Sequence, residues 1–221
     1  MRTIAILPIK SFGAAKQRLA GQLGTGDRKA LVQAMFQDVL AALRRVEGLD
    51  AIAVVTANST AARAAHGEGV LLLDDFEEAG HCEAAAIGVD YAVEHGFDRV
   101  LLVPGDAPLI DPSEIDALLR EAADDATGLV VVPDRHGAGT NALLIHPPAA
   151  IAPAFGPGSR ERHEQLAATA GISCRVAELP SLAIDIDTPE DLEALNARLA
   201  ESRGTANSTR GALRQLEHSY A

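Results

Sequence analysis

Short apolar runs alternate with longer segments of helical periodicity along most of this chain. The short runs are rich in leucine or β-branched residues and are bounded by turn residues, which is typical of strands. Several are apolar without alternation, as in strands that are covered on both faces. They lie at residues 4–9, 51–56, 70–73, 100–103, 129–132, 142–145 and 182–186. The pattern therefore predicts a buried sheet.

Helices are predicted between these strands. One wide apolar stripe at a period of 3.6 residues consists of Leu31, Val32, Met35, Phe36, Val39, Leu40 and Leu43. Residues 84–93 and 115–122 repeat the pattern. Asp111 and Thr188 each precede a proline that is followed by acidic residues, and this arrangement is typical of a capped helix start.

The order of the elements favours an α/β fold with a Rossmann-like open sheet in a single domain, residues 1–200. The predicted strands at 129–132 and 142–145 are separated only by a glycine-rich loop. We therefore expect an antiparallel pair inserted in an otherwise mainly parallel sheet. After residue 200 the sequence turns polar and loses its periodicity, so we expect residues 201–221 to form a mobile tail, with at most a helical turn over 212–216.

Composition excludes several classes of protein. With 31 acidic and 19 basic residues, the chain does not suit a nucleic-acid or anionic-membrane surface. No apolar run approaches the roughly 20 residues of a membrane span, and the first residues lack a signal-peptide cleavage site. Cys82 and Cys174 form neither a disulfide framework nor a zinc motif. We expect a soluble cytoplasmic protein whose apolar helices leave room for a homodimer face.

Three aspartates follow apolar runs that are predicted strands. Asp185 and Asp187 lie two residues apart, and alternate side chains of a strand point to one face, so the two carboxylates can converge on one hard cation. Asp106, in a turn after the run at 100–103, offers a third carboxylate. Carboxylate oxygens are ligands that Mg²⁺ prefers, and the sequence therefore predicts a magnesium site.

Each carboxylate also has a purely structural interpretation. An aspartate in a Gly-Asp-x-Pro turn can accept hydrogen bonds from its own backbone, which would account for Asp106. Asp185 and Asp187 could belong to the cap of the next helix, but Thr188 already occupies the cap position. Two carboxylates so close together repel unless a cation or an arginine joins them. Metal binding is the favoured interpretation of this pair.

The loop after the first predicted strand gathers three of the few cations in the chain: Lys10, Lys16 and Arg18. It is neither a Walker loop nor a dinucleotide fingerprint, because the glycine spacing of both is absent. A solvated basic loop is the structural alternative. In so acidic a chain, the clustering of cations favours a triphosphate.

Two later loops, at residues 134–141 and 155–159, are rich in glycine and hydroxyl groups and are suited to holding a phosphate and a carboxylate. Because these loops and the aspartates follow strands, they could open onto one crevice at the carboxyl ends of the sheet. His163, one helical turn after Ser159, could face the same anion or lie at the surface.

For three further polar residues, both a functional and a structural role are open. His136 could act as a general base or only as a hydrogen-bonding residue. His81 and Glu83 lie at a predicted helix start, where they could contact a base or ribose, or could cap the helix.

The chain resembles the CofC/FbiD guanylyltransferases of coenzyme F-420 biosynthesis over roughly residues 1–199. The resemblance is carried in order by Pro8-Ile-Lys10, Ala15-Lys16-Gln-Arg18-Leu19, Gly105-Asp106-Ala-Pro108-Leu109, Asp134-Arg-His-Gly-Ala-Gly-Thr140-Asn141, Phe155-Gly156-Pro-Gly-Ser159 and Asp185-Ile-Asp187-Thr-Pro-Glu-Asp-Leu192. It implies the fold of the nucleotide-diphospho-sugar transferases (GT-A-like). It also implies transfer of GMP from GTP to a small phosphorylated carboxylic acid, with release of pyrophosphate.

The resemblance also implies roles for particular residues. The metal ligands would be Asp106, Asp185 and Asp187. The phospho-acid would be held by Thr140, Gly156 and Ser159, together with Asn141. The triphosphate would be bound by Lys10, Lys16 and Arg18. Lys16, Arg18 and Asp106 would then be catalytic. Glu83 would lie near the guanine, although the sequence departs from the family at residues 80–84.

The implied chemistry is an in-line attack by an acceptor phosphate oxygen on the α-phosphorus of GTP. The acceptor phosphate is already ionised near neutral pH, so alignment and charge neutralisation matter more than a strong base. The acceptor could be phosphoenolpyruvate, 2-phospho-L-lactate or 3-phosphoglycerate. The alternatives are a nucleotidyltransferase acting on a sugar phosphate or the molybdenum cofactor, whose glycine-rich first loop is missing here, and a catalytically silent nucleotide-binding module.

Overall fold

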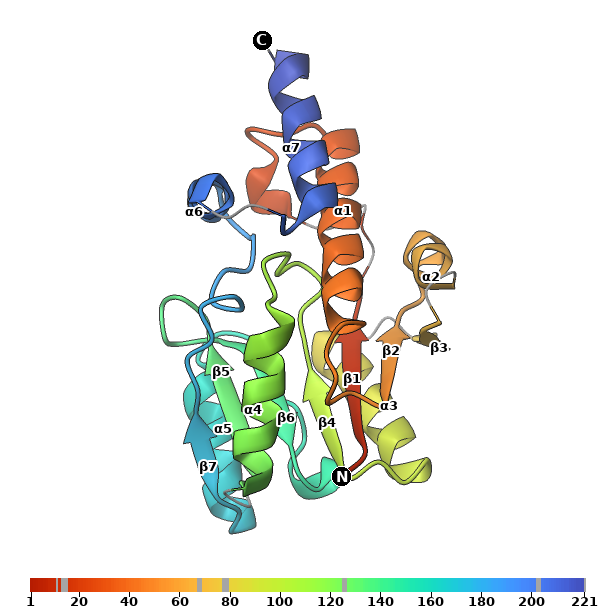
Figure 1. The fold of residues 1–221 in the computed structure, drawn as a ribbon, viewed down its shortest axis with the longest axis vertical. Coiled ribbons are helices and arrows are strands. Elements are labelled where there is room, and N and C mark those ends of the chain that lie inside the picture. The colour runs from red at the N-terminus through yellow and green to blue at the C-terminus, as the bar shows by residue number, and fades with distance from the viewer. Residues whose placement is uncertain are drawn as a thin grey trace.

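A seven-stranded sheet forms the centre of the fold (Figure 1). The computed structural model describes residues 1–10, 12, 16–66, 69–76, 80–124, 127–201 and 204–220. The strands are β1 (Thr3–Pro8), β2 (Ala51–Val55), β3 (Leu71–Leu73), β4 (Arg99–Leu102), β5 (Leu129–Pro133), β6 (Thr140–Ile145) and β7 (Cys174–Val176), in the spatial order β3-β2-β1-β4-β6-β5-β7.

One strand runs against the rest of the sheet. β1 pairs in parallel with β2 and β4, β2 with β3, and β5 with β7. β6 pairs antiparallel with both of its neighbours, β4 and β5. The predicted antiparallel insertion in a mainly parallel sheet is therefore confirmed. Because β6 runs in reverse, its first residues lie at the edge where the parallel strands end.

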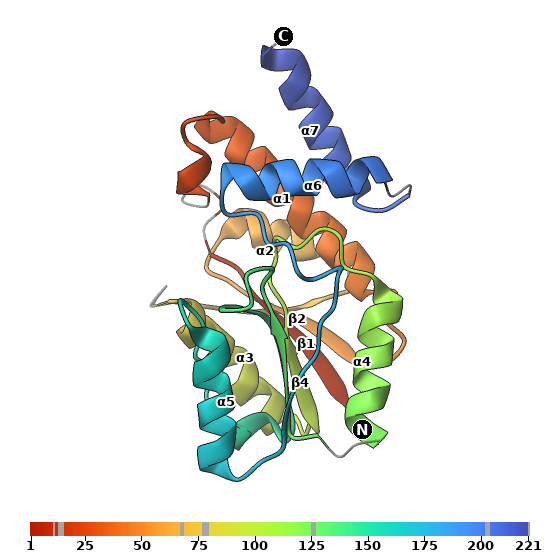
Figure 2. The ribbon, with the colours of Figure 1, turned by 90° about the vertical axis from the view of Figure 1, so that its left-hand side faces the viewer.

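Helices cover both faces of the sheet (Figure 2). They are α1 (Thr25–Leu43), α2 (Ser59–His66), α3 (His81–Glu94), α4 (Pro112–Asp124), α5 (Ser159–Ala170), α6 (Pro189–Glu201) and α7 (Asn207–Tyr220), with short 3-10 turns η1 (Gln17–Leu19) and η2 (Pro148–Ala150). On one face, residues of α1 and α4 pack with Ala5 and Leu7 of β1. On the other, α3 and α5 pack with Ile4 and Ile6. No helix among the described residues combines the length and hydrophobicity that crossing a membrane requires.

The two predicted helix caps are present. Asp111 Oδ1 accepts hydrogen bonds from the backbone N and the hydroxyl of Ser113, at 2.9 and 2.7 Å, at the start of α4. At the start of α6, Thr188 Oγ1 accepts from the backbone N of Asp191 at 3.3 Å. In return, the carboxylate of Asp191 accepts from the backbone N–H groups of Asp187 and Thr188, at 3.0 and 2.7 Å. The capped turn fixes the position of Asp187 just before the helix.

The predicted strand at 182–186 is wrong. The large apolar residues of this segment are buried as expected, and Leu182 and Ile186 are fully so. The backbone, however, hydrogen-bonds to loops and not to the backbone of a strand. The carbonyl of Ala183 accepts from the backbone N of Arg135 at 2.9 Å, and that of Leu182 accepts from the Asn141 side chain at 2.7 Å. The outer position beside β5 belongs instead to β7, whose side chains are half-buried or exposed and so give little apolar signal.

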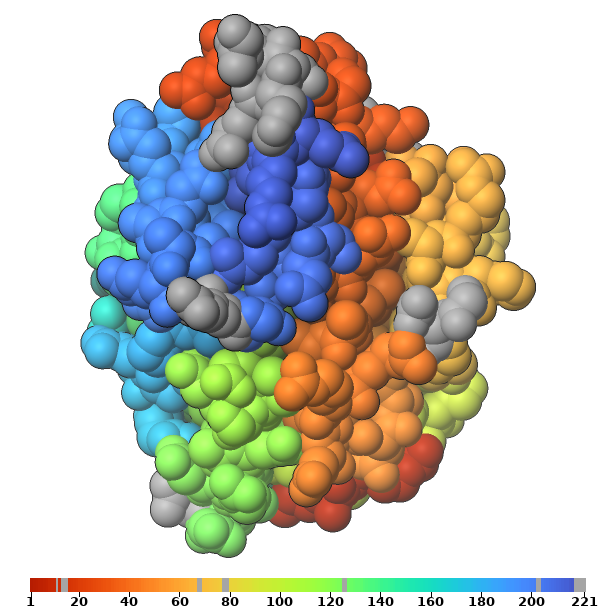
Figure 3. Space-filling view, turned by 45° about the horizontal axis from the view of Figure 1, so that its top comes forward, coloured from red at the N-terminus to blue at the C-terminus, as the bar shows by residue number. Residues whose placement is uncertain are grey.

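The predicted mobile tail is also wrong for residues 204–220, the part that the structure describes. There α7 packs against α1, and Leu213 lies in the same core as that helix. The carboxylate of Asp38 on α1 accepts from the backbone N of Ser208 at 3.0 Å and of Thr209 at 2.7 Å. Figure 3 shows the surface of α6 and α7 continuous with that of α1. The cap of α7 thus comes from a remote residue, which local polarity does not reveal.

Candidate active site

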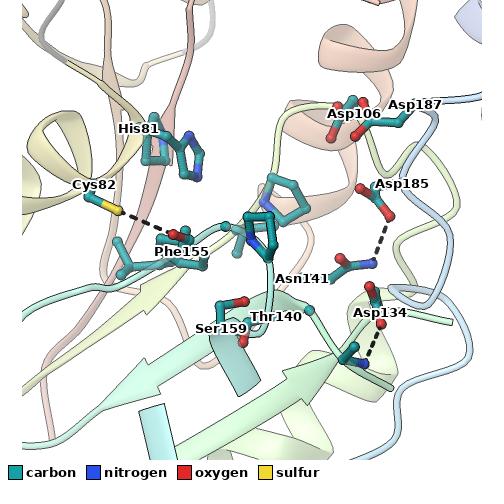
Figure 4. Close-up of a pocket in the computed structure, with 18 of the residues that line it drawn as sticks. His81, Cys82, Asp106, Asp134, Thr140, Asn141, Phe155, Ser159, Asp185 and Asp187 are labelled. Atoms are coloured by element: carbon teal, nitrogen blue, oxygen red, sulfur yellow. Dashed lines mark hydrogen bonds between the residues drawn. The ribbon is translucent and has the colours of Figure 1, made fainter. Parts of the chain in front are cut away.

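A cavity of about 780 Å³ opens at the carboxyl ends of β1 and β4. Its size is in the range of ligand pockets, roughly 300–1,000 Å³. Loops that were predicted to meet at one crevice do line it: Asp106 after β4, Thr140 and Asn141 at the start of β6, the loop from Phe155 to Ser159, and Asp185 with Asp187 (Figure 4). A second cavity of about 270 Å³ shares Asp106 and Asp187 with the first.

The three predicted aspartates lie at one end of this cavity (Figure 4). The ammonium of Lys16 lies between two of them: it donates to Asp187 Oδ1 at 2.8 Å and also to Asp106 Oδ2. Burial alone would lower the pKa of Lys16, but the two carboxylates outweigh burial and hold that pKa above its ordinary value. Lys16 has a φ of 58°, in the left-handed region that residues other than glycine rarely adopt.

Asp185 lies close to the other two carboxylates and is more deeply buried than an ordinary surface aspartate. Burial, and then the nearby carboxylates of Asp106 and Asp187, raise the pKa of Asp185 to about 6. Among the described residues, no three potential ligand side chains lie close enough together to hold an ion as they stand. The chemistry of the donor set nevertheless fits a hard divalent cation, because three carboxylates share one lysine and leave negative charge uncompensated.

The opposite end of the cavity is formed by the loop that leads into α5. Gly156 and Gly158 have φ angles of 113° and 69°, which favour glycine and turn the loop into the helix. Ser159, the first residue of α5, is buried, and within the described residues its hydroxyl has no hydrogen-bond partner. A free hydroxyl at a helix N-terminus is suited to an anion.

Thr140 lies beside Ser159 in this end of the cavity (Figure 4). The loop before Thr140 is held by Asp134, whose Oδ1 accepts from the backbone N of His136 at 3.1 Å and of Ala138 at 3.0 Å. A Cβ on Gly139 would come within 2.6 Å of the Asp134 carboxylate, which explains the glycine. This anchoring role of Asp134 was not predicted, although an aspartate two residues before a backbone donor is a recognised turn signal.

Asn141 connects the two ends of the site. Its amide nitrogen donates to the Leu182 carbonyl at 2.7 Å and more weakly to Asp185 Oδ1 at 3.4 Å. Both hydrogen bonds of this nitrogen therefore go to the segment that carries Asp185 and Asp187. A direct contact between Asn141 and a substrate stays a prediction.

His163 is buried rather than at the surface, and it contacts Thr140 at this end of the cavity. Its Nδ1 lies 3.0 Å from Thr140 Oγ1, and its Nε2 accepts from the backbone N of Ala154 at 2.9 Å. Burial, followed by the charge of Arg162, lowers the pKa of His163 to about 4. The ring of Phe155 lies edge-on to His163, with centroids 5.4 Å apart. The one-turn spacing from Ser159 was the signal in the sequence.

Three more of the predicted residues each line one of the two cavities. Arg18 lines the larger cavity, and the exposed Lys10 lines the smaller one; residues 11 and 13–15 of this loop lie outside the described residues. Glu83 lines the larger cavity too, and its carboxylate folds back over Gly80, where a Cβ would meet Oε2 at 2.2 Å.

The two remaining histidines of the prediction differ in position. His81 lines both cavities, and burial lowers its pKa. His136 is exposed and accepts a hydrogen bond from Arg135 Nε at 3.2 Å. It does not line either of these two cavities, so the hydrogen-bonding interpretation is the better one for His136.

Comparisons with known proteins cover nearly the whole chain. The model of a family described as guanylyl transferase, CofC-like, matches residues 3–219, a span that includes all of α7 but its last residue. A phosphoenolpyruvate guanylyltransferase of Conexibacter woesei is 50% identical over 216 residues, 98% of this chain and 97% of the relative. A 2-phospho-L-lactate guanylyltransferase of Methanothermobacter thermautotrophicus is 33% identical over 220 residues, 96% of each chain.

A solved structure from Desulfovibrio desulfuricans, named as a nucleotide-diphospho-sugar transferase, superposes with a TM-score of 0.75. The alignment covers 99% of this chain and 96% of that one, at 18% sequence identity. At this identity the likeness concerns the fold alone. The expected nucleotide-diphospho-sugar transferase fold is confirmed.

Proposed function

Because this chain belongs to the family of CofC-like guanylyl transferases, we propose that it transfers GMP from GTP to a small phosphorylated carboxylic acid and releases pyrophosphate. The product would be a guanosine diphospho-acid of coenzyme F-420 biosynthesis. Phosphoenolpyruvate is the first candidate for the acceptor, because the relative with 50% identity bears that name. 2-Phospho-L-lactate is the second, from the relative with 33% identity.

The observation that carries this proposal is the division of one cavity into two chemically different ends. At one end, Thr140 and Ser159 present hydroxyls beside the N-terminus of α5, as an anionic acceptor requires. At the other end lie the carboxylates of Asp106 and Asp187 with the ammonium of Lys16. An acceptor and a triphosphate can therefore meet in line between the two ends.

The residues that line the two cavities would bind and align the two substrates. Lys10, Lys16 and Arg18 would receive the triphosphate, and Lys16 can exchange its carboxylate partners for phosphate oxygens. Asp106, Asp185 and Asp187 would hold Mg²⁺, which when bound supplies positive charge against the crowded phosphates.

The transfer forms one bond and breaks one. An ionised phosphate oxygen of the acceptor attacks the α-phosphorus of GTP, and the bond from that phosphorus to the bridging oxygen of the β-phosphate breaks, so pyrophosphate leaves. No proton has to be removed from the attacking oxygen.

The test is a panel of acceptors with GTP and Mg²⁺, read by pyrophosphate release and by mass spectrometry of the product. We expect a guanosine diphospho-acid with phosphoenolpyruvate or 2-phospho-L-lactate, and less with 3-phosphoglycerate. A product only with a sugar phosphate would identify a different nucleotidyltransferase. GTP binding without turnover of any acceptor would identify a nucleotide-binding module.

A further inference from the structure

His163 lies directly beneath the acceptor end of the cavity without lining it. It sits on α5, one helical turn after Ser159, and its side chain is completely buried. Both ring nitrogens have a partner: Nε2 lies 2.9 Å from the backbone N of Ala154, and Nδ1 lies 3.0 Å from Thr140 Oγ1. The imidazole is thus held at both nitrogens, in a single orientation.

The partner at Nε2 determines where the proton of the ring lies. A backbone N–H can only donate, so the N–H of Ala154 requires Nε2 to be an acceptor without a proton. A neutral imidazole then carries its proton on Nδ1. The contact between His163 and Thr140 therefore has one direction: Nδ1–H donates, and Thr140 Oγ1 accepts.

The direction of that bond fixes the hydroxyl proton of Thr140. With Oγ1 already accepting from His163, its own O–H must point to another acceptor. Among the described residues Thr140 Oγ1 has no such acceptor, and Thr140 lines the cavity next to the unpartnered hydroxyl of Ser159. The proton of Thr140 is consequently available to an anion in the cavity.

We propose that His163 is a positioning residue that orients the Thr140 hydroxyl as a donor toward the phosphate or carboxylate of the acceptor. The proposal rests on the function proposed above, since it assigns Thr140 to the acceptor. A Thr140 hydroxyl that can only donate favours an ionised phosphate or carboxylate oxygen of the acceptor at that position. The burial that lowers the pKa of His163 keeps the ring neutral and the donor direction constant at neutral pH.

The first test is independent of turnover. Nitrogen-15 spectra of histidine-labelled full-length protein report which ring nitrogen carries the proton. We expect His163 as the neutral tautomer with hydrogen on Nδ1, unchanged from about pH 5.5 to 7.5. Hydrogen on Nε2, or a charged ring at pH 7, would overturn the proposal whether or not the protein proves to be a guanylyltransferase.

The second test uses a matched pair of variants. In His163→Asn, the side-chain amide can lie near the position of Nδ1 and donate a hydrogen bond to Thr140. In His163→Gln, the longer side chain reaches the position of Nε2 and can accept the hydrogen bond from the backbone N of Ala154. We expect His163→Gln to raise the KM of the acceptor about tenfold and His163→Asn to raise it less, both with unchanged KM for GTP. The opposite order would indicate a purely structural role through Ala154.

A double-mutant cycle with Thr140→Val completes the test. If His163 acts through the Thr140 hydroxyl, His163→Gln should add less than about a twofold effect on acceptor KM once that hydroxyl is gone. Fully additive losses would overturn the proposal. Wild-type protein that uses none of the acceptors would contradict the proposed function instead, and in that case the tautomer alone decides the role of His163.

Discussion

The ammonium of Lys16 donates a hydrogen bond of 2.8 Å to Asp187, which lies 171 residues later in the chain. This contact joins the first loop of the sheet to the segment before α6. It brings the residues proposed for the triphosphate against those proposed for the metal.

Asp187→Asn should abolish turnover while leaving the fold intact. The side chain of Asp187 is about half exposed, at 55%, so its carboxylate contributes little to the core, yet it is a proposed magnesium ligand. Rates across a magnesium titration and a thermal melting curve measure the two effects. Asp106→Ala should behave alike, and Glu121→Gln, at an exposed carboxylate paired with Arg175, is the control. Near-wild-type rates for Asp187→Asn would refute the metal assignment.

Replacing both Lys16 and Arg18 with alanine should weaken GTP binding without changing the affinity for the acceptor. Lys16 contacts Asp106 and Asp187 in the smaller cavity, and Arg18 lines the larger one. The loops proposed for the acceptor lie at the other end of the larger cavity. Calorimetry of GTP in the presence of Mg²⁺ measures the effect. Lys29→Ala with Arg45→Ala, both exposed and outside these cavities, is the matched control. Unchanged affinity and unchanged turnover would remove this loop from the active site.

Ser159→Ala and Thr140→Val should each raise the KM of the acceptor more than that of GTP. Each change removes a proposed hydrogen bond to an anion, worth roughly 1.5–3 kcal/mol, which corresponds to about a tenfold to hundredfold change. Thr140→Ser retains a hydroxyl and is the control for Thr140→Val. An equal rise for GTP would place these hydroxyls at the nucleotide.

Asp38→Ala should destabilise the protein by about 1–2 kcal/mol, the typical cost of losing a helix N-cap. The buried carboxylate accepts from the backbone N and the hydroxyl of Thr209, both at 2.7 Å. Urea unfolding measures the loss. Asp38→Asn keeps one acceptor oxygen and should lose less, and a wild-type stability for Asp38→Ala would show that α7 does not depend on this cap.

His163 should make stability depend on pH in the acidic range. Burial lowers its pKa from 6.5 to about 4, so between these values the unfolded chain binds a proton that the folded protein does not. The stabilisation is complete above about pH 6.5 and is lost as the pH falls toward 4, up to ~3 kcal/mol in all. Unfolding free energies of wild type and His163→Asn from pH 4 to 7.5 should converge as the pH falls; a constant difference would contradict the shift.

The sequence predicts those parts of the fold whose signal is local. The alternation of apolar runs and amphipathic stripes located six of the strands, and capping residues located the starts of α4 and α6. Segment 182–186 misled because Leu182 and Ile186 are buried in the same core as α1 and α4, as strand residues would be. The carbonyls of Leu182 and Ala183 nevertheless bond to Asn141 and Arg135 rather than to the backbone of a neighbouring strand. Burial alone cannot distinguish a strand from such a segment.

The same limit applies to the site. Motif residues such as Asp106, Thr140 and Ser159 could be chosen because each follows a predicted strand or starts a helix. The role of His163 depends on the backbone N–H of Ala154, which no pattern of side chains records. Asp134 was missed for another reason: its partners lie only two and four residues later, but many loop aspartates could make such a turn. The position of Lys16 between Asp106 and Asp187 likewise depends on tertiary structure, because both aspartates are remote in the sequence.

The remote cap of α7 has a consequence for how the chain is made. Synthesis proceeds from the N-terminus, so α1 emerges from the ribosome with the carboxylate of Asp38 unsatisfied and the apolar side facing α7 uncovered. Its partner Thr209 arrives 171 residues later, close to the end of translation. The nascent protein can therefore complete this half of its core only when almost the whole chain has been released, and loss of the last fifteen or so residues would leave an incomplete domain rather than a shortened one.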